Sequence, residues 1–387
     1  MGSQERTIYL DYNATTPVLD EVFDAMVPYF RDHFANPSSA HRAGRAARRA
    51  VDRARRQVAQ ALGAKPSEVV FTSGGTESNN LALFGVAHAS APPARIVTSA
   101  IEHPAVAAPC RRLMQHGFEL TWLGVDRRGV VDVEQALEAI DEHCALVTVM
   151  HSNNETGVVQ PLAPLVEKTQ QVGAIFHTDA SQSMGKVPLN VREMGVDLLT
   201  IAGHKVYAPK GIGALYVRDG IDLCPPVCGA GHESGLRPGT ENVPSIVGLG
   251  VACEIAARDL AQEQRRQQKL CDHLLGLLRS SIPDLAVNGE GAPRLPNTLN
   301  LRFPDAEGAR ILERLPHLCA STASACKAKG AAPSSVLLAM GLTEREARGS
   351  VRLSLGRCTT KEEVERVAEG LVGAWGATTG QITRQRQ

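Results

Sequence analysis

The chain has 387 residues, enough for two or three domains of ordinary size. Its 41 basic residues balance 41 acidic ones, so no global field favours nucleic acid or an anionic membrane as a partner. The first residues are polar, and no apolar run reaches the roughly 18 residues of a membrane span. Nine scattered cysteines indicate reduced thiols and lack the paired spacing of zinc ligands. We expect a cytoplasmic protein without a metal site.

Short apolar strands alternate with amphipathic helices along the first part of the chain. We expect strands at 69–71, 95–97, 146–149, 175–177, 198–201 and 214–217, with helices at 104–116, 132–142 and 162–172. Such alternation is typical of a mostly parallel sheet that is covered by helices. This part of the chain is therefore predicted to form a large α/β domain.

An Ala/Arg pattern over 40–62 predicts a long helix with seven arginines. They are Arg42, Arg45, Arg48, Arg49, Arg53, Arg55 and Arg56. This face could bind RNA or phosphate groups. A solvated face or a subunit contact is the simpler interpretation, because the chain as a whole carries no net charge.

Residues 243–280 predict a long amphipathic helix that connects two domains. Beyond it we expect strands at 297–303, 317–321 and 350–355, with helices at 306–315 and 360–375. This pattern indicates a smaller α+β domain. We place the large domain at 18–258 and the small domain at 259–387. The N-terminal segment 1–17 could belong to either.

Three motifs follow predicted strands and together indicate one site. Thr72–Asn80, with the sequence TSGGTESNN, opens a helix whose free N–H groups suit a phosphate, although a plain turn would use the same residues. Asp179 could pair with a protonated ring nitrogen or cap a helix. Lys205, beside glycine and histidine, suits covalent bonding to an aldehyde. A phosphate cup, a carboxylate and a lysine on successive strands are what binding of pyridoxal 5′-phosphate demands.

In these motifs the chain resembles the class V aminotransferases, and specifically the cysteine desulfurases and selenocysteine lyases. The resemblance covers nearly the whole chain in the right order. The segments that carry it are Leu10–Pro17, Thr72–Asn80, Glu102-His103, Asn153–Gly157, His177–Gln182, His204–Gly213, Leu236–Asn242 and Ser350–Thr360. It implies the fold of the type I pyridoxal-phosphate-dependent transferases, an α/β fold with a large mostly parallel sheet domain and a smaller α+β C-terminal domain.

The resemblance also implies roles for individual residues. Lys205 would hold the cofactor covalently, Asp179 would meet its pyridine nitrogen, and His103 would stack on its ring and move protons. Further contacts to the cofactor would come from Gly75, Thr76 and His204 at the phosphate, Gln182 and Asn154 at the phenolic oxygen, and Thr240 of the partner subunit in a homodimer. Arg352 would clamp the substrate α-carboxylate, and Asn154 could also touch the substrate.

Cys326 is the candidate sulfur carrier. It lies in the small-residue stretch 320–330, with the sequence ASTASACKAKG, which is poorly suited to packing as core. Lys327 and Lys329 would favour its thiolate, the form that attacks sulfur. By the resemblance, L-cysteine would be converted to L-alanine, with its sulfur left on Cys326 as a persulfide.

Three other functions stay open at this point. A selenocysteine lyase would release selenium from L-selenocysteine, a C–S β-lyase would form pyruvate without a required thiol, and a sulfur-relay protein would not be catalytic. Ala202 replaces a serine of many cysteine desulfurases, and the residues after Cys326 differ from those of housekeeping enzymes. The sulfur would pass to an acceptor protein. We expect this acceptor to serve a dedicated pathway, such as tRNA modification or a biosynthesis, at least as readily as general assembly of iron–sulfur clusters.

Overall fold

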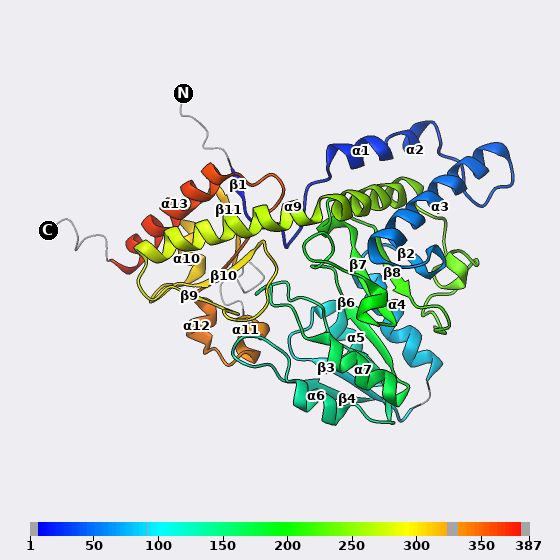
Figure 1. Ribbon diagram of the computed structural model, residues 1–387, viewed down its shortest axis with the longest axis horizontal. Helices are drawn as coiled ribbons and strands as arrows, with labels where there is room; N and C mark the ends of the chain where they lie inside the picture. The colour runs from blue at the N-terminus through cyan, green and yellow to red at the C-terminus, as the bar shows by residue number, and fades with distance from the viewer. Residues whose placement is uncertain (1–6, 91, 323–331, 381–387) are drawn as a thin grey trace.

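The computed structural model describes residues 7–90, 92–322 and 332–380. Figure 1 shows a larger and a smaller part, and one long helix, α9 (Val243–Ser281), runs through both. The predicted sulfur carrier Cys326 lies outside the described residues, as do Lys327 and Lys329. Within the described ranges, no helix has both the length and the apolar character that crossing a bilayer requires.

A seven-stranded sheet forms the centre of the larger part. Its strands lie in the order β2 (Val69–Thr72), β8 (Gly213–Val217), β7 (Leu198–Ala202), β6 (Ile175–Asp179), β5 (Cys144–Thr148), β3 (Arg95–Ser99) and β4 (Glu119–Leu123). Only β8 runs in the direction opposite to the other six strands of this sheet. The predicted mostly parallel sheet is thus confirmed. The edge strand β4 was not predicted, because its partly exposed residues do not form a buried apolar run.

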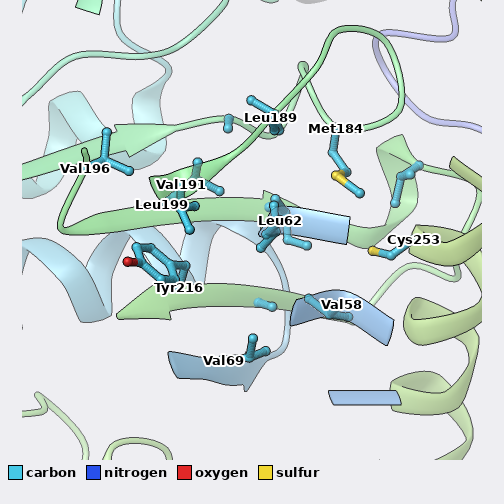
Figure 2. Packing of buried hydrophobic residues seen from close by; sticks show 14 of the residues in the cluster. Val58, Leu62, Val69, Met184, Leu189, Val191, Val196, Leu199, Tyr216 and Cys253 are labelled. Carbon is cyan, nitrogen blue, oxygen red and sulfur yellow. The ribbon is translucent and has the colours of Figure 1, made fainter. Parts of the chain in front are cut away.

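Successive residues of each strand face opposite sides of this sheet, and each side has its own helices. In β2, Val69 and Phe71 belong to one core cluster and Val70 to another. Figure 2 shows part of the first cluster, in which Leu62 of a covering helix lies among residues such as Tyr216. The first side is covered by α3 (Arg42–Leu62), α6 (Val133–Ala139), α7 (Leu162–Val172) and the first half of α9, and the second by α4 (Gly75–Ala89) and α5 (Pro104–Met114).

Short helices complete the larger part. They are α1 (Asp20–Met26), α2 (Pro28–Arg31), α8 (Val191–Met194) and the single turns η1 (Pro66–Glu68), η2 (Gly203–Lys205) and η3 (Glu233–Gly235). Of these, η2 matters most for the site, because it follows strand β7 directly and ends at the predicted cofactor lysine.

An antiparallel sheet of four strands organises the smaller part. Its order is β12 (Ser321–Thr322), β13 (Ser350–Ser354), β10 (Thr298–Arg302) and β9 (Ala286–Val287). The helices of this part are α10 (Gly308–Glu313), α11 (Ser335–Ala339), α12 (Glu344–Arg348) and α13 (Lys361–Thr379). The expected smaller α+β unit is therefore present.

The N-terminal segment joins the core of the smaller part. Strand β1 (Ile8–Tyr9) pairs in parallel with β11 (Leu318–Cys319), and Ile8 and Leu10 lie in one cluster with Leu274 of α9. The chain then crosses to the larger part, where the Thr16 backbone N–H donates to the His204 carbonyl at 2.9 Å. This segment therefore carries residues from the smaller core to the predicted cofactor lysine.

Two substitutions two residues apart on α9, on different faces of the helix, should have opposite effects on stability. Leu274 is fully buried, so Leu274→Ala should lower the free energy of unfolding by about 2–5 kcal/mol through lost burial and a residual cavity. Gly276 is exposed, and an added Cβ would meet no atom within 4 Å, so Gly276→Ala should stabilise by about 0.5–1 kcal/mol. Urea unfolding followed by circular dichroism measures both. Equal midpoints for the two variants would contradict the assignment of Leu274 to this core.

Candidate active site

A cavity of about 310 Å³ lies where five strands of the large sheet end. The strands β2, β3, β5, β6 and β7 run in the same direction, so the loops after them meet at one edge of the sheet. Eight predicted site residues line this cavity: Gly75, Thr76, His103, Asn154, Asp179, Gln182, His204 and Lys205. The fold thus brings together side chains that lie up to 130 positions apart in the sequence.

The loop after β2 forms a close-fitting cup at one end of the cavity. Gly74 has φ 149°, a conformation that residues with side chains rarely adopt. A Cβ on Gly75 would lie 3.0 Å from Ser181 Oγ and 3.3 Å from Ala202 Cβ, so only glycine leaves this space open. Helix α4 begins at Gly75, and its first N–H groups lack intrahelical partners. The cup therefore fits a phosphate group.

The Asp179 carboxylate is held firmly at the end of β6. Its Oδ2 accepts a hydrogen bond from Asn79 Nδ2 at 2.7 Å, and its Oδ1 accepts one from the Ser181 backbone N–H at 2.9 Å. The side chain is buried, so its charge acts strongly on neighbouring groups. A fixed, buried carboxylate of this kind suits a protonated ring nitrogen. The role of Asn79 was not predicted, although Asn79 lies one helical turn beyond Thr76 in the same motif.

Two histidines near the cavity favour the neutral form. His103 caps α5, and its Nδ1 accepts a hydrogen bond from the Ala105 backbone N–H at 3.1 Å, so the ring proton is on Nε2. Burial lowers the pKa of His103; the Asp179 charge opposes this shift, and the Lys205 charge adds to it. Burial likewise lowers the pKa of His204 to about 4. Neutral rings can stack on a cofactor or exchange a proton at a defined nitrogen.

Lys205 has the environment that a covalent cofactor lysine needs. Its Nζ donates to the Asn13 carbonyl at 2.8 Å. Burial lowers the pKa of Lys205 to about 8, although the Asp179 charge opposes this effect. About a tenth of the amine is therefore neutral and nucleophilic at pH 7, far more than in an ordinary lysine.

Arg352 of β13, in the smaller part, bonds to Asn154, a residue that lines the cavity. One guanidinium nitrogen donates to the Asn154 carbonyl at 3.0 Å, and another to Asp11 Oδ1 at 2.6 Å and Ser321 Oγ at 3.2 Å. Its Nε is buried without a partner among the described residues. This unpaired donor beside Asn154 is suited to a carboxylate ligand.

Thr240 is not brought to the cavity of its own chain. It is exposed and is not among the residues that line the cavity, so a contact to a partner subunit stays a prediction. The next residue, Glu241, accepts two hydrogen bonds from Arg48 at 2.7 Å. Glu233, earlier in the same loop, is paired in a similar way with Arg55. Two of the seven arginines of α3 therefore hold this loop.

Comparisons with known proteins agree with this geometry. Residues 8–367 match the family model for "Aminotransferase class-V". A "Cysteine desulfurase IscS" from Dictyoglomus turgidum is 45% identical over 363 residues, 93% of this chain and 92% of the relative. The human "Cysteine desulfurase" is 41% identical over 95% of this chain and 82% of its own length. Of solved structures, a "NifS-like protein" has a TM-score of 0.88 at 36% identity, covering 95% of this chain and 98% of its own. The structure "SspA in complex with cysteine" has a TM-score of 0.81 at 40% identity, and the match covers 90% of this chain and 99% of its own.

The lowered pKa of Lys205 can be tested through the pH dependence of its reaction with an aldehyde. Only the neutral amine attacks, so the rate at which cofactor-free protein captures pyridoxal 5′-phosphate should rise with pH, with a midpoint near 8. An ordinary lysine would give a midpoint of about 10.4. Stopped-flow absorbance measures the rate. Asp179→Asn should move the midpoint to lower pH, because the carboxylate that favours the ammonium form is gone. A wild-type midpoint near that of a free lysine would refute the assignment.

Proposed function

The chain belongs to the class-V aminotransferase family and to the cysteine desulfurases within it, and we propose that it converts L-cysteine to L-alanine, with the sulfur left on Cys326 as a persulfide. The observation that carries this proposal is a set of groups at one cavity: Lys205 and Asp179 line it, and Arg352 bonds to Asn154, which also lines it. A buried amine with a lowered pKa, a fixed carboxylate and an unpaired guanidinium N–H belong to Lys205, Asp179 and Arg352. These groups match an amino acid substrate and an aldehyde cofactor.

We propose pyridoxal 5′-phosphate as the cofactor. The glycine cup at Gly75 and Thr76 would receive the phosphate, Asp179 the pyridine nitrogen and Lys205 the aldehyde carbon. Gln182 and Asn154, which line the same cavity, would face the phenolic oxygen. When bound, this cofactor withdraws electrons from the substrate carbon that carries the amino group.

The residues around the cavity then have separate tasks. Arg352 would bind the substrate α-carboxylate through its guanidinium group, which lies next to Asn154. Lys205 Nζ accepts the proton that leaves the α-carbon, since its pKa allows the neutral amine near neutral pH. His103 holds a proton on Nε2 and can pass it on within the cavity.

The sulfur step needs a thiolate from the smaller part. As the Cys326 sulfur attacks the substrate sulfur, an S–S bond forms and the C–S bond breaks. The electron pair of the broken bond stays on the carbon, which takes up a proton to become the methyl group of alanine. The persulfide would then pass to the thiol of an acceptor protein. This proposal also includes a homodimer in which Thr240 serves the partner's cavity, and a reducing cytoplasm that keeps Cys326 reduced.

Replacing the proposed sulfur carrier should separate this activity from related ones. Cys326→Ala should lower the release of alanine from L-cysteine by about 100-fold or more, because covalent catalysis is lost, while the cofactor absorbance stays unchanged. Cys228→Ala, at an exposed position, is the matched control and should keep full activity. Alanine, pyruvate and sulfide are quantified for both variants. Pyruvate formation that survives Cys326→Ala would indicate a β-lyase, and turnover of L-selenocysteine alone would indicate a selenocysteine lyase.

Arg352 should act mainly on substrate binding. Arg352→Gln removes the charged donor for the α-carboxylate, so KM for L-cysteine should rise by about 10–100-fold, the loss expected for a charge-assisted hydrogen bond. Steady-state kinetics and substrate-induced absorbance changes measure this effect. Arg352→Lys should restore little of the lost affinity, because a point charge cannot reproduce the planar guanidinium. An unchanged KM in both variants would remove Arg352 from the substrate site.

A further inference from the structure

Lys186 is a buried lysine for which the proposed chemistry has no task. It lies four residues after Gln182, in the turns that follow β6, and its side chain is largely hidden from solvent. Its Nζ donates to Gln182 Oε1 at 2.8 Å and to Asn13 Oδ1 at 3.0 Å. Both acceptors are amide oxygens, and neither carries a charge that would offset an ammonium group.

The surroundings of Lys186 favour the neutral amine. Burial lowers its pKa well below the ordinary value, and the positive charges of Lys205 and Arg352 act in the same direction. A neutral amine has two N–H groups, and two acceptors are present. Both donors are therefore satisfied, whereas an ammonium would bring a third N–H and a charge into this buried position.

The two neighbours of the Gln182 amide fix which way it faces. The Asn13 backbone carbonyl can only accept, and it lies 2.9 Å from Gln182 Nε2. On the other side, the Lys186 amine donates to Gln182 Oε1. A flipped amide would oppose oxygen to oxygen at the first contact, and at the second the Lys186 amine would lose its acceptor and would have to turn its lone pair toward the Gln182 N–H. In the observed orientation, Nε2 uses one N–H for Asn13 and keeps its second for a ligand in the cavity that Gln182 lines.

Asn13, the second acceptor of Lys186, is itself held by several hydrogen bonds, so it fixes the position of the Lys186 amine. Asn13 Oδ1 also accepts from Asn297 Nδ2 at 3.1 Å, and Asn13 Nδ2 donates to Thr298 Oγ1 at 2.9 Å. The same residue's carbonyl accepts from both Gln182 Nε2 and Lys205 Nζ. One network therefore joins Lys186 to the groups proposed to meet the cofactor.

We propose that Lys186 is a positioning residue that locks the Gln182 amide so that an N–H, and not the carbonyl, faces the phenolic oxygen of the cofactor. This inference rests on the proposed function, which assigns Gln182 to that oxygen. A lysine that only fills the core would support folding without affecting the cofactor, so the test needs a readout on the cofactor itself.

The pH titration of the visible cofactor absorbance in the holoenzyme supplies this readout. Gln182→Leu removes the N–H that would stabilise negative charge on the phenolic oxygen. The proton on the nitrogen that links Lys205 to the cofactor is then held more tightly by this oxygen. The midpoint should rise by about 0.5–1 pH unit, the shift expected for one hydrogen bond. Lys186→Met should raise the midpoint in the same direction by at least half as much. The double variant should match Gln182→Leu alone, because both changes act through one amide.

Asn288→Leu is the control, since it removes two buried hydrogen bonds, to Asn300 Oδ1 and Ser350 Oγ, and within the described part of the chain Asn288 has no hydrogen bond to Asn13 or Gln182. It should lower the melting temperature and leave the midpoint in place. A Lys186→Met holoenzyme with a lower melting temperature and an unmoved midpoint would overturn the inference. If Lys186→Met does not fold, Lys186→Gln takes its place under the same criteria. An unmoved midpoint in Gln182→Leu would instead refute the proposed contact of Gln182, which distinguishes that failure from a failure at Lys186.

Discussion

The buried Lys205 amine beside the Asp179 carboxylate is the interaction on which the site depends. Burial makes the ammonium form costly, and the carboxylate partly compensates, so the pKa of Lys205 falls to about 8. That balance holds only while the carboxylate stays fixed, and Asn79 and Ser181 fix it by occupying both of its oxygens. Burial lowers the pKa of His103, His204 and Lys186 as well, so the groups near this pair favour uncharged forms.

The fold supplies this balance by bringing distant segments to one place. The strand ends of the large sheet contribute Asp179 and Lys205, while Arg352 and Asn297 come from the smaller part. Asn13 links the two sets, since its carbonyl serves Lys205 and its side chain bonds Asn297. Because α9 is packed into both cores, a relative shift of the two parts would disturb Arg352 and Asn13 together. The geometry for binding an amino acid is thus a property of the whole chain.

Much of this arrangement could be predicted from the sequence, because its signals are local. Buried parallel strands show as apolar runs, and the chemistry of Asp179 and Lys205 follows such runs directly. The two-residue strand β1 is too short to show a period, so the packing of the N-terminal segment could not be predicted. The contacts of Asn13 and Lys186 depend on atoms far away in the sequence, and no spacing rule reveals them. Helical spacing from Thr76 could have revealed Asn79.

The environment of the buried thiols makes them poor candidates for sulfur chemistry. Burial raises the pKa of four cysteines far above neutrality, to about 11 or 12, so their thiolates are scarce and their sulfur is inert; these are Cys110, Cys144, Cys253 and Cys271. A sulfur carrier needs the opposite conditions, with access to the cavity and positive charges nearby. In the sequence, the stretch with Lys327 and Lys329 offers those charges next to a cysteine. Burial therefore makes these four thiols unsuitable as sulfur carriers, which agrees with the proposal that assigns the transfer step to Cys326.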